Sequence, residues 1–344
     1  MNGVATRITV ADTSGVAEAR RVGSSMAGRL GFDETGVGKV AIAITEAATN
    51  LIKHASGGEI LLLPLGSPDP DGLEMVVLDR GPGMENFAES LRDGHSTAGS
   101  PGTGLGAMSR MAARLDAYSR PGAGTAIAAQ FKKEGSQANR AAARAQGLDV
   151  AGFSVALRGE CLCGDAWTVR RTPTGMMVLV VDGLGHGAPA HEASGAALEV
   201  FQKSALGKPA EMMDVIHRGM RATRGASAAV VGIDTESQTI ASSGIGNIAG
   251  VVLSQESARH LVSMNGTLGH EIRKIREFSY PWTSHSLLIL HSDGVSSRWD
   301  LATYPGLSQK PLSLIAGVLY RDRGRERDDA TVVAVSQENS RWAW

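Results

Sequence analysis

Two spacings of hydrophobic positions alternate along the first 131 residues. Apolar positions recur every three or four residues over 13–30, 34–54 and 105–115, which predicts three helices. Shorter apolar runs over 5–10, 59–65 and 73–79, with further runs after residue 115, predict strands. Helices and strands arranged in this order indicate an α+β fold for this part of the chain.

Residues 150–337 carry a different pattern, in which short apolar runs dominate. The runs that predict strands lie at 152–158, 168–171, 176–181, 228–234, 248–253, 286–291 and 330–335. Helical spacing interrupts them at about 187–205, 209–224 and 311–321. Many strands with a few inserted helices predict a layered, β-rich sandwich.

A polar segment separates the two patterns. Residues 132–149 read KKEGSQANRAAARAQGLD, without a large aliphatic residue before Leu148. A chain of 344 residues is long enough for two domains at about 150 residues each. We therefore expect a first domain over 1–133, a linker over 134–149 and a second domain over 150–344.

Charge and hydropathy narrow the classes of partner. The 34 lysines and arginines nearly balance 35 aspartates and glutamates, for a net charge of −1. Because neither part carries a basic excess, we expect no nucleic-acid partner. The longest apolar runs fall far short of the roughly 20 residues that cross a bilayer, and the start MNGVATRITV has no signal-peptide pattern. We expect a soluble, cytoplasmic protein with no membrane partner.

One predicted helix carries a polar stripe. In VGKVAIAITEAATNLIKHA, the residues Glu46, Asn50, Lys53 and His54 are spaced i, i+4, i+7 and i+8, so they share one face. Such a stripe is typical of a solvated helix face. It also lines up a carboxylate, an amide, an ammonium and an imidazole, and the helix alone leaves both interpretations open.

Two glycine-rich segments follow this helix. The strand LEMVVL runs into Asp79-Arg80-Gly81-Pro82-Gly83, in which the glycines let the backbone approach a flat ligand. Gly102-Thr103-Gly104-Leu105-Gly106 opens a predicted helix whose N–H groups can face phosphates. This second segment matches a dinucleotide fingerprint in form. A polar loop over 85–101 stands where that fingerprint needs a strand, so we reject a Rossmann fold.

In this order and spacing, the three segments resemble the GHKL ATPases, and most of all the small serine kinases of the anti-sigma and RsbT type. The resemblance covers about residues 5–131 and implies a Bergerat α/β sandwich that binds ATP and Mg²⁺. It implies that Asn50 is the Mg²⁺ ligand, that Asp79 accepts the adenine amino group and that Glu46 is the base for the acceptor hydroxyl. Gly81 and Gly83 would line the base pocket, and Gly102, Thr103, Gly104, Leu105 and Gly106 would form the phosphate lid. Lys53 would pair with phosphate, or else remain a solvated cation favoured by the helix dipole.

Acidic residues punctuate the second domain. Asp165 lies in CGDAW, Asp182 follows MMVLVV, Asp293 follows SLLILHS, and Asp328-Asp329 precede ATVVAV. Any single Asp-Gly pair is typical of a hairpin turn. Several acids at the rim of one sheet, without a Cys or His cluster, would instead make an oxygen-ligand site suited to Mg²⁺ or Mn²⁺.

The order GD, DGxGHG, SDG and DDxT over about 150–337 resembles the metal-dependent serine/threonine phosphatases of the SpoIIE and RsbX branch. The resemblance implies an αββα sandwich in which Asp182 bridges two metal ions. Asp165 and the Gly183 carbonyl would complete one metal site, Asp293 and Asp328 the other, and Asp329 would support them. Hydrolysis would be direct, without a phospho-enzyme. His186 would protonate the leaving alkoxide, or else pack its loop.

The two resemblances together imply a kinase and a phosphatase on one chain. The implied partner is a STAS-domain phosphoprotein, RsbS-like, RsbR-like or an anti-anti-sigma factor, with a downstream regulator or sigma factor beyond it. Two alternatives stay open. One is an ATP-binding module that sequesters a sigma factor or another partner, and the other is a phosphatase that ATP gates without any kinase activity.

Overall fold

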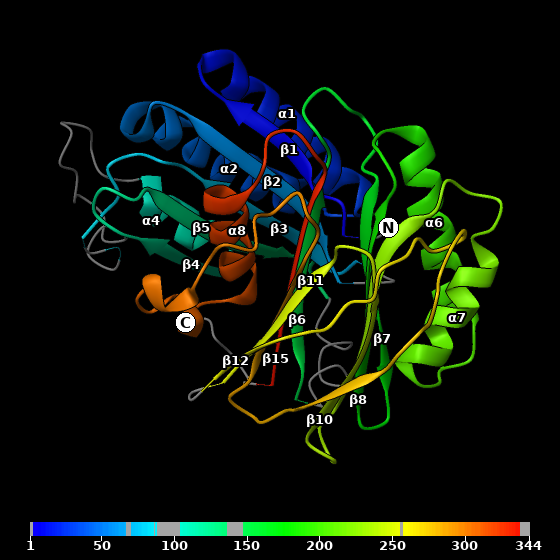
Figure 1. Cartoon of the computed structure of the whole chain (residues 1–344). Coiled ribbons are helices and arrows are strands. Elements are labelled where there is room, and N and C mark those ends of the chain that lie inside the picture. Colours follow the sequence, from blue (N-terminus) through cyan, green and yellow to red (C-terminus); the bar gives the residue numbers. More distant parts are fainter. Residues whose placement is uncertain are drawn as a thin grey trace.

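The computed structural model describes residues 3–66, 70–85, 87, 104–135, 147–254 and 257–337. Three five-stranded sheets organise these residues into stacked layers (Figure 1). One sheet belongs to the N-terminal unit and two belong to the C-terminal unit. None of the helices within these ranges is long and apolar enough to traverse a lipid bilayer.

The N-terminal sheet is antiparallel and has the strand order β1-β2-β3-β5-β4. Apolar side chains between this sheet and its covering helices form a core that includes Ile44, Leu62 and Met75. The carboxylates of Asp12 and Asp33 cap the first two helices by accepting hydrogen bonds from backbone amides. The elements are β1 (Thr6–Val10), α1 (Thr13–Arg29), α2 (Glu34–Ala55), β2 (Gly58–Leu65), β3 (Gly72–Leu78), α4 (Gly104–Met111), β4 (Arg114–Ser119) and β5 (Thr125–Lys132).

The prediction of a helix over 105–115 is wrong beyond Met111. Helix α4 ends at that residue, and strand β4 begins at Arg114. Leu115 and Ala117 of β4 enter the core beneath the helices, whereas Tyr118 enters the core on the opposite face of the sheet. This alternation buries apolar side chains on both faces, which a helix could not do here.

The C-terminal unit is a sandwich of two antiparallel sheets, β13-β10-β9-β8-β7 and β12-β11-β14-β15-β6. Helices α6 and α7 cover the first sheet, and the apolar layer between the sheets includes Val178, Trp282 and Leu290. Helix α8 covers the second sheet, which completes the αββα arrangement and confirms the predicted fold class. The elements are β6 (Asp149–Val155), β7 (Asp165–Thr172), β8 (Gly175–Gly183), α6 (Ala188–Lys203), α7 (Pro209–Gly219), β9 (Ala226–Asp234), β10 (Thr239–Ile245), β11 (Ala249–Leu253), β12 (Ala258–His260), β13 (Phe278–Pro281), β14 (Leu287–His291), α8 (Leu312–Arg323) and β15 (Ala330–Ser336).

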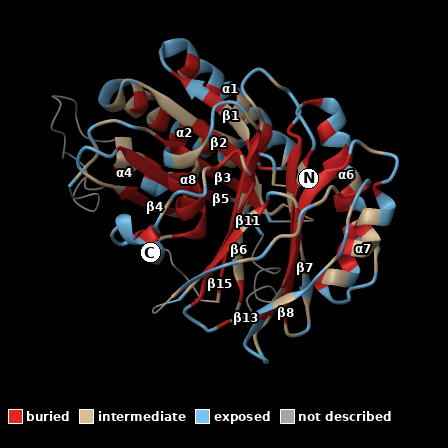
Figure 2. Ribbon diagram, viewed as in Figure 1, coloured by how far each residue is buried: buried red, intermediate tan, exposed pale blue. Residues whose placement is uncertain are grey.

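Helix α8 joins the two units. Nine of its 12 residues are buried, because the N-terminal sheet packs on the face that the second sheet leaves free (Figure 2). Leu314 and Leu319 share one apolar cluster with Leu63 and Val76 of the N-terminal sheet. A Cβ atom added at Gly317 would lie 3.0 Å from Val76 Cγ1, so the helix and the sheet are in close contact. The two units therefore share a core.

Candidate nucleotide and metal sites

The polar stripe of α2 meets the start of α4. Glu46 and Asn50 are half-buried, one helical turn apart. A Cβ atom added at Gly104 would lie 2.8 Å from Glu46 Oε2 and 3.5 Å from Asn50 Nδ2 and Oδ1. Gly104 thus lets the start of α4 approach the carboxylate and the amide more closely than any residue with a side chain could.

The other predicted nucleotide-site residues lie in different settings. Lys53 is exposed in the last turn of α2, together with His54. Leu105 packs against the N-terminal core, and Gly106 is buried in α4. Gly102 and Thr103 lie outside the described residues.

Asp79 lies at the end of β3 and organises the loop that follows. Its Oδ1 atom accepts hydrogen bonds from the amides of Gly81 at 2.8 Å and Thr125 at 3.0 Å. Burial raises the pKa of this carboxyl, while the two amides and the Arg321 charge oppose that shift. An aspartate held in this way keeps its second oxygen for another donor.

Glycines allow the Asp79 loop to fit against its neighbours. A Cβ atom on Gly81 would lie 2.8 Å from the Ala55 backbone at the end of α2. Gly83 has φ +70°, and a Cβ atom there would lie 2.0 Å from the Arg120 carbonyl oxygen. Side chains at either position would push the loop away from α2 or from the β4–β5 turn.

In the C-terminal unit, Asp165 and Asp182 are direct partners across the β7–β8 pair. Burial raises the pKa of Asp165 to about 7, and the charges of Asp329 and Asp328 add to the shift. Burial also raises the pKa of Asp182 to about 9. The charges of Asp165, Asp293, Asp328 and Asp329 add to this shift. The pKa of Asp328 is raised by burial and by Asp293. The strand ends therefore gather five carboxyl groups that interact electrostatically, although they are far apart in sequence.

Neighbouring polar groups orient these acids. The Ser292 hydroxyl donates to Asp165 Oδ2 at 2.6 Å, and the Asn247 amide donates to Asp293 Oδ2 at 2.7 Å. Asp329 accepts hydrogen bonds at 2.7 Å on each oxygen, from the amides of Leu157 and Gly164. Because both its oxygens are already engaged, Asp329 fixes the loop before Asp165.

His186 lies exposed in the loop after Asp182. Its Nδ1 atom is 2.8 Å from Glu160 Oε1, and its charge lowers the pKa of Asp328. Glu160 thus orients an imidazole close to the acidic cluster.

The donor set suits a hard divalent cation, because it consists of carboxylates whose charges are costly to bury unpaired. Asp182, Asp165, Asp293 and Asp328 are the carboxylates among which such an ion could be held. Within the described ranges, no three Asp, Glu, His or Cys side chains already form a metal-binding group. Asp182 and Asp328 are both partly exposed.

Sequence reasoning did not single out the residues that hold the acids in place. Ser292 lies within the SDG motif and Thr331 within DDxT, and the Thr331 amide donates to the Ser292 hydroxyl at 2.9 Å. Those motifs therefore signal both residues. Asn247 and Glu160 have no local signal, because only the fold brings their loops to Asp293 and His186.

Comparison with known proteins follows the same division. Residues 9–131 match the histidine kinase-like ATPase domain, and residues 172–338 match the stage II sporulation protein E (SpoIIE) family. The serine/threonine-protein kinase RsbT of Bacillus subtilis (strain 168) is 32% identical over 114 residues, which are 33% of this chain and 86% of RsbT. The chain belongs to the RsbT family through its N-terminal unit. The C-terminal unit is homologous to the phosphoserine phosphatase RsbX of the same organism, with 24% identity over 139 residues, 40% of this chain and 70% of RsbX.

Solved structures extend the comparison. A chain described under "The bacterial stressosome: a modular system that has been adapted to control secondary messenger signaling" is 28% identical, with a TM-score of 0.50. The matched region spans 55% of this chain and 98% of the stressosome chain. RsbX in complex with magnesium shares the fold, with 20% identity, a TM-score of 0.50, and coverage of 55% and 94%. The kinase-like N-terminal unit and the phosphatase-like C-terminal unit together fit an enzyme of a partner-switching pathway.

Proposed function

We propose that this chain phosphorylates and dephosphorylates a serine or threonine of one STAS-domain partner, RsbS-like, RsbR-like or an anti-anti-sigma factor. The observation that carries the proposal is that one chain contains a unit similar to a kinase and a unit similar to a phosphatase. Residues 1–133 and 150–344 would be the two catalytic domains, joined by 134–149. We expect the chain to act in the cytoplasm, upstream of a regulator or a sigma factor.

For the kinase half, residues on and around α2 would bind ATP and Mg²⁺ and act on the acceptor hydroxyl. Asp79 would accept the adenine amino group between Gly81 and Gly83, and Asn50 would hold Mg²⁺. Gly104, with the rest of the 102–106 segment, would cover the phosphates, and Lys53 would pair with them. Glu46 would remove the proton from the acceptor hydroxyl, since its carboxylate lies one helical turn from Asn50 and faces the start of α4 at Gly104.

For the phosphatase half, Asp182 would hold two Mg²⁺ or Mn²⁺ ions, with Asp165 and the Gly183 carbonyl on one side and Asp293 and Asp328 on the other. Such ions polarise a phosphoryl group and make a bound water acidic. Asp329 would position the Asp165 loop through two backbone amides. His186, oriented by Glu160, would give a proton to the leaving serine oxygen.

The kinase half is tested by Glu46→Ala. We expect ATP binding to remain and phosphoryl transfer to a STAS protein to fall by about a hundredfold or more, as for loss of a general base. Equal transfer rates in the variant and the unchanged chain would remove Glu46 from this role.

Two hydrogen bonds favour a second candidate, a phosphatase gated by ATP. Arg321 of α8 donates a hydrogen bond to the Asp79 carbonyl at 3.1 Å, and Arg80 donates one to the Arg321 carbonyl. A change at the nucleotide loop would therefore reach the C-terminal unit directly. This candidate requires Asp79→Asn to alter the phosphatase rate while no phosphate is ever transferred to protein. A third candidate, partner sequestration, requires a stable stoichiometric complex and little turnover.

A further inference from the structure

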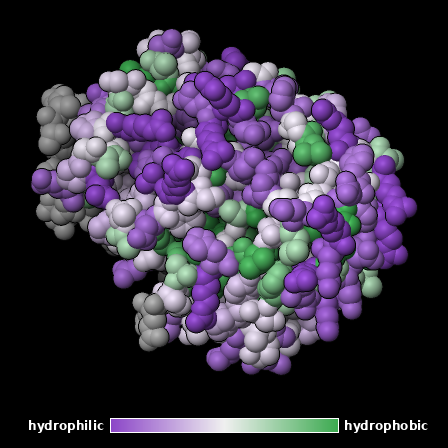
Figure 3. All heavy atoms as spheres, viewed as in Figure 1, coloured by the Kyte–Doolittle hydropathy of each residue, from purple (hydrophilic) through white to green (hydrophobic). Residues whose placement is uncertain are grey.

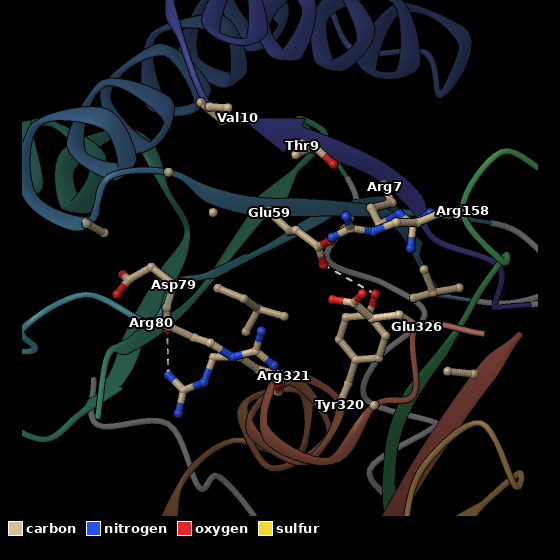
Figure 4. Close-up of a pocket in the computed structure, with 18 of the residues that line it drawn as sticks. Arg7, Thr9, Val10, Glu59, Asp79, Arg80, Arg158, Tyr320, Arg321 and Glu326 are labelled. Carbon is tan, nitrogen blue, oxygen red and sulfur yellow. Dashed lines mark hydrogen bonds and ion pairs between the residues drawn. The ribbon is translucent and has the colours of Figure 1, made fainter. Parts of the chain in front are cut away.

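A cavity of about 310 Å³ lies between the two units. The N-terminal unit lines it with β1 and with the turn from α2 into β2, and the C-terminal unit lines it with the segment after β6 and the connection from α8 to β15. Figure 4 shows Arg7, Arg158 and Glu59 gathered at one end of the cavity, and Arg80 and Arg321 at the other. Neither unit alone forms this cavity.

The walls of the cavity are held together by contacts across the interface. Arg158 forms an ion pair with Glu59 at 3.2 Å, and the Tyr320 hydroxyl donates to the other Glu59 oxygen at 3.2 Å. Within the C-terminal unit, the Tyr320 ring packs on Phe153 with ring centroids 5.7 Å apart, which holds the tyrosine in place. Together with the shared core around α8, these contacts make the cavity a preformed feature of the fold.

The lining is rich in arginine. Among the residues that the structure describes, five arginines and four acids line the cavity. Of the acids, Asp79 is engaged by the amides of Gly81 and Thr125, and Asp328 is a candidate metal ligand. Glu59 is held by Arg158 and Tyr320, which leaves Glu326 as the one exposed, uncommitted acid among the lining residues that the structure describes. The lining residues are Arg7, Arg80, Arg158, Arg321 and Arg325, with Glu59, Asp79, Glu326 and Asp328.

Arg325 links this basic lining to the acidic cluster. It is exposed and lies three residues before Asp328. Its backbone amide donates to the Gly294 carbonyl at 2.7 Å, directly after Asp293. Since Asp328 itself lines the cavity, the cavity opens beside the candidate phosphatase site.

We propose that this cavity binds the residues flanking the phosphorylated serine or threonine of a protein substrate, and that acidic flanking residues are preferred. The inference rests on the phosphatase half of the proposed function. Arg7 and Arg325 attract the acidic segment, while the phosphate reaches the carboxylate cluster beyond Asp328. The molecular face in Figure 3 is mainly hydrophilic, with some hydrophobic residues exposed near its centre. The kinase-like unit thereby supplies part of the phosphatase's recognition surface.

The test uses two synthetic phosphoserine peptides, one flanked by aspartates and one by lysines, together with p-nitrophenyl phosphate, all with Mn²⁺ and the full chain. We expect the unchanged chain to prefer the acidic peptide by about tenfold in kcat/KM, through a lower KM. Arg325→Ala and Arg7→Ala should each remove most of that preference, and Arg7→Lys should restore part of it. The matched control is Arg259→Ala, because β12 lies at the opposite edge of its sheet from β6 and Arg259 is exposed.

The outcomes separate the two proposals. The cavity is overturned as a recognition site if the unchanged chain shows no preference for the acidic peptide. It is also overturned if both alanine variants keep the same preference as the unchanged chain. Because the preference is a ratio between two peptides, partial loss of folded protein in a variant does not change it. Absence of hydrolysis for all three substrates in the unchanged chain would instead overturn the phosphatase half of the proposed function.

Discussion

Asp165 and Asp182 carry the strongest electrostatic signature of any residues in the candidate sites. Burial and neighbouring carboxylates raise their pKa values to about 7 and about 9, so the folded chain binds protons more tightly than the unfolded chain. Without a cation, folding stability therefore falls as pH rises from about 4 through these values. A divalent ion would relieve the same repulsion by displacing the protons.

This electrostatics predicts the pH dependence of metal binding. Between pH 7 and 9, Asp182 must lose its proton for the ion to bind, so the affinity for Mg²⁺ should rise about tenfold per pH unit. Isothermal titration calorimetry at several pH values measures this slope. Asp182→Asn should bind weakly and lose the slope. An affinity for Mg²⁺ that stays constant across this range would contradict the assignment of the acidic cluster.

Gly104 provides a second test at a single residue. In Gly104→Ala the new methyl group would lie 2.8 Å from Glu46 Oε2, so the carboxylate must move while the fold stays intact. We expect phosphoryl transfer to fall by about tenfold or more, with little change in melting temperature. Gly38→Ala is the matched control, since a Cβ atom there meets nothing within 4 Å, and it should leave transfer unaffected. A Gly104→Ala variant as active as the control would argue against Glu46 as the base.

At the scale of elements, the sequence pattern predicts that α8 is a helix but not which sheets pack against it. Its sequence LSLIAGVLYRDR was predicted as a helix from apolar spacing, but spacing does not reveal which layers contact it. In the structure Leu314, Ile315 and Leu319 fill the space between two sheets that belong to different units. Such all-round burial is typical of helices in the interior of a larger protein.

The shared core predicts cooperative unfolding of the two units. Ile315→Ala removes a fully buried side chain and should lower the free energy of unfolding by about 2–5 kcal/mol. We expect both units to melt in one transition that shifts as a whole, as measured by differential scanning calorimetry. Two separate transitions, with only one of them moved by Ile315→Ala, would show that the units fold independently.

Other elements show where sequence patterns succeed and where they fail. Most strands of both units were predicted to within a few residues, because their apolar runs are long or alternate clearly. Strand β10, TIASSGI, was missed because small and polar residues dilute its signal, although most of it is buried. Strands β12 and β13 were missed because they are short and largely exposed.

On the scale of the whole molecule, the sequence predicted which residues are candidates for chemistry but not what surrounds them. Motif order identified Asp79, Asp182 and Asp293, since each follows a strong apolar strand. The contacts of Arg321 with the Asp79 loop, and of Asn247 with Asp293, join segments that no local pattern connects. The interdomain cavity likewise depends on how the N-terminal sheet docks on α8.

The central claim is that one chain adds and removes the same phosphate. Intact-mass spectrometry of a candidate STAS protein tests it most directly, first after incubation with the full chain and ATP–Mg²⁺, then after removal of ATP and addition of Mn²⁺. We predict the gain of a single phosphate that is then lost, and in Asp182→Asn a gain that persists. Absence of any gain, with a stable complex instead, would contradict the kinase half, and persistence of the phosphate with the unchanged chain would contradict the phosphatase half.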